Sequence, residues 1–105
     1  MAVNTYPAFA LDAATGFTFN ATSSRVALPG TLGGDSLVRV HNLGPNDVVV
    51  RLGADNTVTV SLTNGIAIGA GRTEYLTLGS NTYIAGISVG SAGLMGSVCN
   101  IAVGN

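Results

Sequence analysis

One serine in this chain stands in a pattern that can carry nucleophilic chemistry. Ser88 lies in a G-x-S-x-G segment, residues 86–90, which matches the nucleophile elbow of some hydrolases. That chemistry needs a strand–turn–helix context and a histidine that follows the serine. The only histidine, His41, comes earlier, and no helical period follows the segment. We therefore expect Ser88 to be an ordinary strand residue and the chain not to be an enzyme.

Metal and cofactor chemistry have no clear ligand set either. Cys99 is the only cysteine and His41 the only histidine, so no thiolate–imidazole cluster is available. Cys99 stands in a strand-like run and is interpreted as a small buried hydrophobe. Asp55 and Asn56 could bind a cation at a loop, but their types favour a turn. We expect no metal and no cofactor.

Charge is unusually scarce. Charged residues make up 9% of the 105 residues, against about 25% in an ordinary soluble domain. Four basic residues neutralise few phosphates, which argues against nucleic acid as a partner. No apolar run reaches the length of a membrane span, and no basic segment precedes an apolar one at the start, so we expect neither a membrane partner nor a signal peptide. So few charges suit a protein that lives in an assembly, and we predict a homo-oligomer, a dimer or a trimer.

The elements that position these residues are read from apolar alternation. Phe17 and Phe19 share one face of a strand, and the same period of two recurs down to the last residues. Asn64-Gly65 is the strongest short hairpin signal, and it follows a predicted strand that spans residues 58–62. About eight short strands with regular turn signals predict an all-β fold, a sandwich or a barrel. The predicted core is Val38, Val40, Val48, Val50, Leu52, Val58, Val60, Leu76, Leu78, Ile84, Ile101 and Val103.

Residues 37–53 are predicted to form the central hairpin, with a loop of about five residues. Pairing Val40 with Val50 and Val38 with Leu52 would place these four residues and Val48 on one side, and Arg39 opposite Arg51 on the other. Two facing arginines would suggest an anionic partner, because like charges directly opposite are unfavourable. A register shifted by two would leave two solvated arginines instead.

Residues 1–15 lack clean alternation and contain Pro7, which blocks a central strand. We interpret them as an extended N-terminal arm whose Tyr6, Phe9 and Leu11 pack on something apolar. The alternative is an edge strand on the chain's own core. Residues 16–105 would then form the β-sandwich domain.

From Val38 onward the order of strands and turns resembles a group of small bacteriophage virion proteins. In their pattern a strand ends in a polar residue and Asn, a Gly-Pro-Asn turn follows, and a Val-rich strand ends in Arg-x-Gly. Residues 40–53 match it here, with His41-Asn42, Gly44-Pro45-Asn46 and Arg51-Leu52-Gly53. The pattern resumes at residues 69–71, continues with Glu74 and Leu76, and ends at residues 82–85. The first 30 residues do not match.

This resemblance implies an antiparallel, jelly-roll-like β-sandwich on the virion surface, and head decoration (cement) proteins are the closest fit. Such a protein would be made in the host cytoplasm and bind the major capsid protein of the assembled phage head. The residues expected at a capsid or subunit interface are Tyr6, Phe9, Leu11, Arg39, His41 and Arg51. The alternative is a tail or fibre module that binds a carbohydrate or receptor, which the absence of Trp disfavours.

Overall fold

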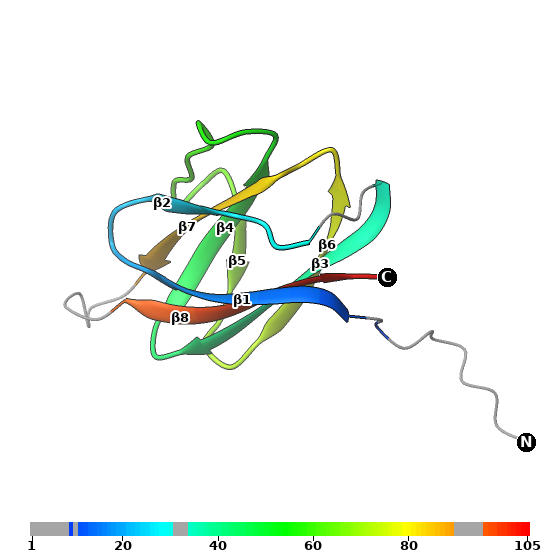
Figure 1. Cartoon of the computed structure of the whole chain (residues 1–105). Coiled ribbons are helices and arrows are strands. Elements are labelled where there is room, and N and C mark those ends of the chain that lie inside the picture. The colour runs from blue at the N-terminus through cyan, green and yellow to red at the C-terminus, as the bar shows by residue number, and fades with distance from the viewer. Residues whose placement is uncertain (1–8, 10, 31–33, 90–95) are drawn as a thin grey trace, which may run out of the picture.

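A computed structural model of the chain describes residues 9, 11–30, 34–89 and 96–105, and these contain eight β-strands (Figure 1). The strands are β1 (Leu11–Phe19), β2 (Ser24–Ala27), β3 (Gly34–Gly44), β4 (Asp47–Gly53), β5 (Ile66–Ile68), β6 (Thr73–Gly79), β7 (Tyr83–Val89) and β8 (Ser97–Gly104). None of the described residues is helical, and so none belongs to a helix that could cross a membrane.

The strands form two four-stranded antiparallel sheets. Sheet A has the order β1-β8-β3-β6 and sheet B the order β2-β7-β4-β5. The first strand pairs with the last and the second with the seventh, while β3 pairs with β6 and β4 with β5. The chain is thus a long ribbon of paired strands that wraps until β3 meets β8 and β4 meets β7. This is the jelly-roll form of the β-sandwich, and it confirms the predicted fold class.

The main core lies between the sheets and follows the alternation of the strands. On β3 the inward residues Val38 and Val40 are fully buried, and on β4 Val48 and Val50 are. Phe17 and Phe19 meet edge to face, with ring centroids 5.0 Å apart. The fully or almost fully buried side chains of this core are Phe19, Val38, Val40, Val48, Val50, Ile68, Leu78, Ile84, Cys99, Ile101 and Val103. Of the predicted core, Leu52 and Leu76 pack against this cluster at its rim.

The predicted central hairpin is wrong. β3 belongs to sheet A and β4 to sheet B, and only Pro45 and Asn46 separate them in the chain. Arg39 is paired with Tyr75 and Ala102, and Arg51 with Ala85, so the two arginines do not face each other. Val38 and Val40 of β3 and Val48 and Val50 of β4 still point inward, because they cover the core from opposite sheets.

A buried polar cluster holds the corner between β3 and β4. Asn42 is fully buried, and its Nδ2 donates to the carbonyl oxygens of Asn46 (2.8 Å) and Ile68 (3.0 Å). Its Oδ1 accepts from the backbone N–H of Gly44, where φ is 94°. The Ser97 hydroxyl lies 2.7 Å from Oδ1 as well, so all polar atoms of this side chain are satisfied. A positive φ at residue 44 explains why glycine stands there.

The strand expected at residues 58–62 is also wrong, because this stretch lies in a 12-residue loop, 54–65, between β4 and β5. Val60 is nonetheless 5% exposed, since it packs with Val49 and Ala85 on the outer side of sheet B. Val58, Ile87 and Val89 complete this second apolar cluster. The loop therefore covers the outer face of sheet B.

The sequence placed residues 11–15 in an N-terminal arm, but they form the first part of β1. Leu11 pairs with Gly104 and Thr15 with Ile101, so this stretch is an edge strand of sheet A. Tyr6 and the rest of residues 1–8 lie outside the described residues.

Candidate functional site

The outer face of sheet A gathers most of the residues expected at an interface. Paired residues of neighbouring strands point to the same side of a sheet, so the register defines rows of side chains across it. Three rows cross all four strands on this face: Leu11–Gly104–Leu37–Thr77, Ala14–Ala102–Arg39–Tyr75 and Gly16–Asn100–His41–Thr73. Leu11, Arg39 and His41 therefore stand on one surface.

This face is apolar at its rim and lacks carboxylates in its three rows. Six large hydrophobic side chains among the described residues are exposed, and four of them belong here by register or alternation: Leu11 (62%), Leu43 (59%), Tyr75 (51%) and Val98 (40%). Of the two middle strands, β8 contributes Gly104, Ala102 and Asn100 to the three rows, and Ala102 is only 1% exposed. The other middle strand, β3, contributes Leu37, Arg39 and His41, and Arg39 is the one Arg or Lys in these rows.

Two contacts order the polar and aromatic side chains of this face. His41 Nδ1 lies 2.6 Å from the Thr73 hydroxyl, which couples β3 to β6 through side chains. The rings of Phe9 and Tyr75 meet edge to face, with centroids 5.7 Å apart. Phe9 thus joins Leu11, Arg39 and His41 on sheet A, whereas Arg51 stands on β4 in sheet B. Tyr6 lies outside the described residues.

The corresponding face of sheet B is closed by the 54–65 loop. Val60 of this loop is buried against Val49 and Ala85, so the middle of that face already has a cover. Leu62, on the same loop, is exposed to the same extent as Leu43 (59%). The described residues therefore offer sheet A as the larger open face.

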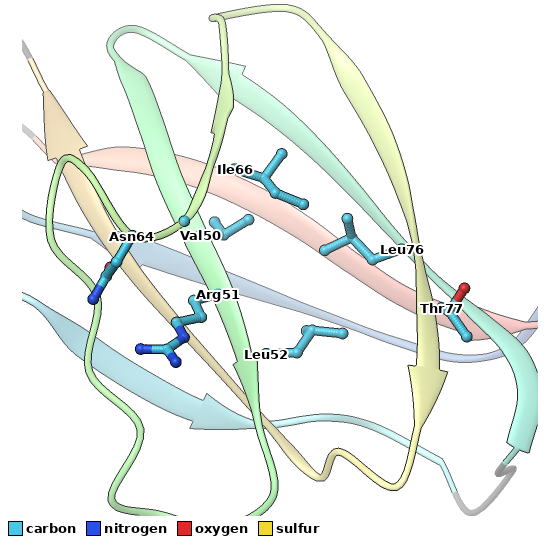
Figure 2. A pocket seen from close by; sticks show the side chains of 8 residues that line it. Val50, Arg51, Leu52, Asn64, Ile66, Leu76 and Thr77 are labelled. Atoms are coloured by element: carbon cyan, nitrogen blue, oxygen red, sulfur yellow. The ribbon is translucent and has the colours of Figure 1, made fainter.

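A side cleft of about 410 Å³ lies where the short strand β5 begins, between β4 of sheet B and β6 of sheet A (Figure 2). Its lining is Val50, Arg51, Leu52, Asn64, Gly65, Ile66, Leu76 and Thr77. Val50, Ile66 and Leu76 gather in the gap, while Arg51 extends from the opposite side of β4 (Figure 2). Ile66 is 43% exposed because nothing among the described residues covers this edge.

The structure places the residues considered for catalysis and metal binding in a strand and in a turn. Ser88 lies within β7, with its backbone N–H bonded to Asn20, and not at a strand-to-helix turn. Asp55 accepts from the side chain and the backbone N–H of Thr57, and both bonds hold the pKa of Asp55 below its usual range. No cluster of three His, Cys, Asp or Glu side chains suited to a metal occurs in the described part of the chain.

Sequence reasoning did not identify Leu43, Tyr75 and Val98 as interface candidates. Each is a single exposed apolar residue in its own strand, and such residues are ordinary on protein surfaces. Only the pairing of β3, β6 and β8 places them on one face. Comparison with protein-family models, with curated proteins and with solved structures found no match.

Proposed function

We propose that this protein is a structural virion protein that binds the assembled phage head through the outer face of sheet A and stabilises it. The observation that carries the proposal is that Leu11, Leu43, Tyr75 and Val98 are exposed on the same face as Arg39, and that the three rows across this face contain no carboxylate. Burial of such a surface against a larger partner releases water from apolar area without desolvating many charges.

Fold and composition support the same proposal from other directions. The jelly roll occurs widely in viral capsid domains, although a fold alone does not define a function. A chain with 9% charged residues is poorly protected against association, as expected of a protein that works within an assembly. The partner is then the major capsid protein, and the protein is located on the capsid surface.

The proposal is tested with purified heads of the phage that encodes this chain. Leu43→Asp places a charge in the proposed interface, and we expect at least a tenfold loss of head binding in co-sedimentation, because a desolvated lone charge is costly. Leu62→Asp is the matched control, since both leucines are 59% exposed and both lie on the surface. Neither change should lower the melting temperature by more than a few degrees.

Two results would contradict the proposal. Equal head binding by the Leu43→Asp and Leu62→Asp variants would remove sheet A as the docking face. A density map of the intact particle without this chain on the head would remove the capsid role itself. Binding to isolated glycans with an affinity that depends on Tyr75 would favour the alternative, a receptor-binding module of a tail or fibre.

A further inference from the structure

We propose that two copies of this chain associate through β6, which pairs with its own counterpart around a two-fold axis at Tyr75 and fuses the two A sheets. The proposal specifies the partner and interface of the expected homo-oligomer. It rests on the edge of the sheet and not on the capsid role.

β6 is the least protected of the described edge strands. It spans seven residues and, among the described strands, pairs only with β3. The other three edge strands are guarded, because β1 has a register irregularity between Leu11 and Ala13, β2 has four residues and β5 has three. Proteins normally blunt edges with bulges, short strands, Pro, Lys or inward-pointing charged side chains, and of these β6 has only the charged Glu74, which lies on the inner side by alternation. An edge of this kind pairs with another strand wherever one of suitable shape is present.

The free backbone groups of β6 belong to every second residue. The N–H of Asn42 donates to the carbonyl of Arg72 over 2.9 Å, and this pair is next to the pair His41–Thr73 in the ladder of β3 and β6. Hydrogen-bonded and non-hydrogen-bonded pairs alternate along an antiparallel ladder. The backbone groups of Thr73, Tyr75 and Thr77 therefore point away from β3, toward the open edge.

These three residues are symmetric about Tyr75. An antiparallel copy centred there pairs Tyr75 with Tyr75 and Thr73 with Thr77, and all the free backbone groups of the three residues then find partners. Aromatic–aromatic and Thr–Thr cross-strand pairs are both favourable. Because Phe9 packs on Tyr75 within each copy, the axis would bring four aromatic rings into one row. The sequence of this strand, Thr-Glu-Tyr-Leu-Thr, is thus complementary to itself.

Charge and area favour a second copy and limit the strength of the contact. Each chain carries a net charge of −1, so two copies repel each other little. On the inner side of the strand pair, Glu74 would lie opposite Leu76 of the other copy and diagonally across from the other Glu74, which is mildly unfavourable. One strand pair buries less than the roughly 1,200–2,000 Å² of a stable complex, so the dimer should dissociate on dilution.

Sedimentation over a range of roughly 10 µM to 1 mM, where weak association constants are measurable, tests the proposal directly. We expect a monomer–dimer equilibrium that Tyr75→Lys weakens at least tenfold, because a lysine on the edge opposes strand pairing. Thr18→Lys is the matched control, since it puts the same charge on the opposite edge strand of the same face. Glu74→Gln should lower the dissociation constant of the dimer several-fold, because it removes the repulsion between the two Glu74 side chains. Added salt should lower the dissociation constant of the unchanged chain, because it screens this repulsion.

Hydrogen exchange identifies the interface residue by residue. The amides of Thr73, Tyr75 and Thr77 should gain protection with rising protein concentration, while those of Glu74 and Leu76 are protected throughout. Thr77→Pro, which removes one outward N–H but none bonded to β3, should keep the fold and abolish the gain.

Three outcomes would overturn the proposal. The first is a protein that is still monomeric at about 1 mM, near the weakest affinity considered, and the second is an oligomer in which the amides of Thr73, Tyr75 and Thr77 exchange freely. The third is protection of these amides only when heads are added, which would mean that a strand of the capsid protein pairs with β6. A protein that stays monomeric but binds heads contradicts the dimer and is consistent with the capsid role. A protein that dimerises but does not bind heads contradicts the capsid role and is consistent with the dimer.

Discussion

The side-chain amide of Asn42 in β3 donates a hydrogen bond of 3.0 Å to the backbone carbonyl of Ile68 in β5, and this contact joins the two sheets across the corner of the fold. The same amide bonds the carbonyl of Asn46, and its oxygen accepts from Gly44. One fully buried polar side chain thus determines how the chain leaves sheet A and enters sheet B.

Removal of this side chain should be strongly destabilising. In Asn42→Ala the carbonyl of Ile68 loses this donor and the N–H of Gly44 loses its acceptor, while the carbonyl of Asn46 keeps the Ser97 hydroxyl; each buried group left unsatisfied costs about 1–3 kcal/mol. We expect a loss of about 3–5 kcal/mol in the free energy of unfolding, measured by urea denaturation. Asn64→Ala is the control, because Asn64 is exposed and bonds only the N–H of Ser61; it should cost less than about 1 kcal/mol. Similar costs for both variants would contradict this role of Asn42.

Gly86, the first glycine of the G-x-S-x-G segment, is required for packing. A Cβ at this position would lie 2.5–2.7 Å from ring carbons of Phe19. Gly86→Ala should therefore destabilise the protein by about 1–3 kcal/mol through overpacking. Gly16→Ala is the control, because the nearest atom to its added Cβ is 4.0 Å away. If thermal unfolding shows the two variants to be equally stable, the close contact with Phe19 does not constrain position 86.

Val50 and Val60 belong to two different apolar clusters, so their substitution tests whether the two clusters unfold together. Val50 is fully buried between the sheets, and Val60 is buried between the 54–65 loop and sheet B. Val50→Asp should cost several kcal/mol and unfold the protein cooperatively, since an isolated buried charge is expensive. Val60→Asp should release the loop while the sandwich persists, which hydrogen exchange would show as faster exchange confined to residues 54–65 and their contacts. Global unfolding by both changes would show that the loop is part of the main core.

The buried thiol predicts how stability depends on alkaline pH. Burial raises the pKa of Cys99 from 9.0 to about 11. Between these values the unfolded chain has lost the thiol proton while the folded chain retains it, so the free energy of unfolding falls as pH rises. The slope from this group is at most about 1.4 kcal/mol per pH unit. Cys99→Ala should lack this component, and urea unfolding at about pH 8 and about pH 10.5 measures the difference. Parallel losses in the two proteins would contradict the assignment to Cys99.

The period of two in the sequence is enough to predict the fold class and most of the core. Val38, Val40, Val48 and Val50 were expected inside and are fully buried, because alternation alone decides which side of a strand faces the core. The spacing of turn residues predicted about eight strands, and the described residues contain eight. Val60 shows what alternation does not predict. The alternation around it predicted a strand, but Val60 lies in a loop and is buried because that loop packs on sheet B.

Strand partners and the candidate surface depend on tertiary structure. A hairpin and two facing sheets require the same inward valines on β3 and β4, so alternation does not distinguish them. The buried bond from Asn42 to Ile68 connects residues 26 positions apart and links β3 of sheet A to β5 of sheet B, and the bond from Ser97 to Asn42 connects residues 55 positions apart within sheet A. Tyr75, Arg39 and Ala102 share a row only because β6, β3 and β8 are neighbours. Such long-range contacts form when the whole ribbon wraps, since local sequence carries the direction of each side chain but not the identity of the strand beside it.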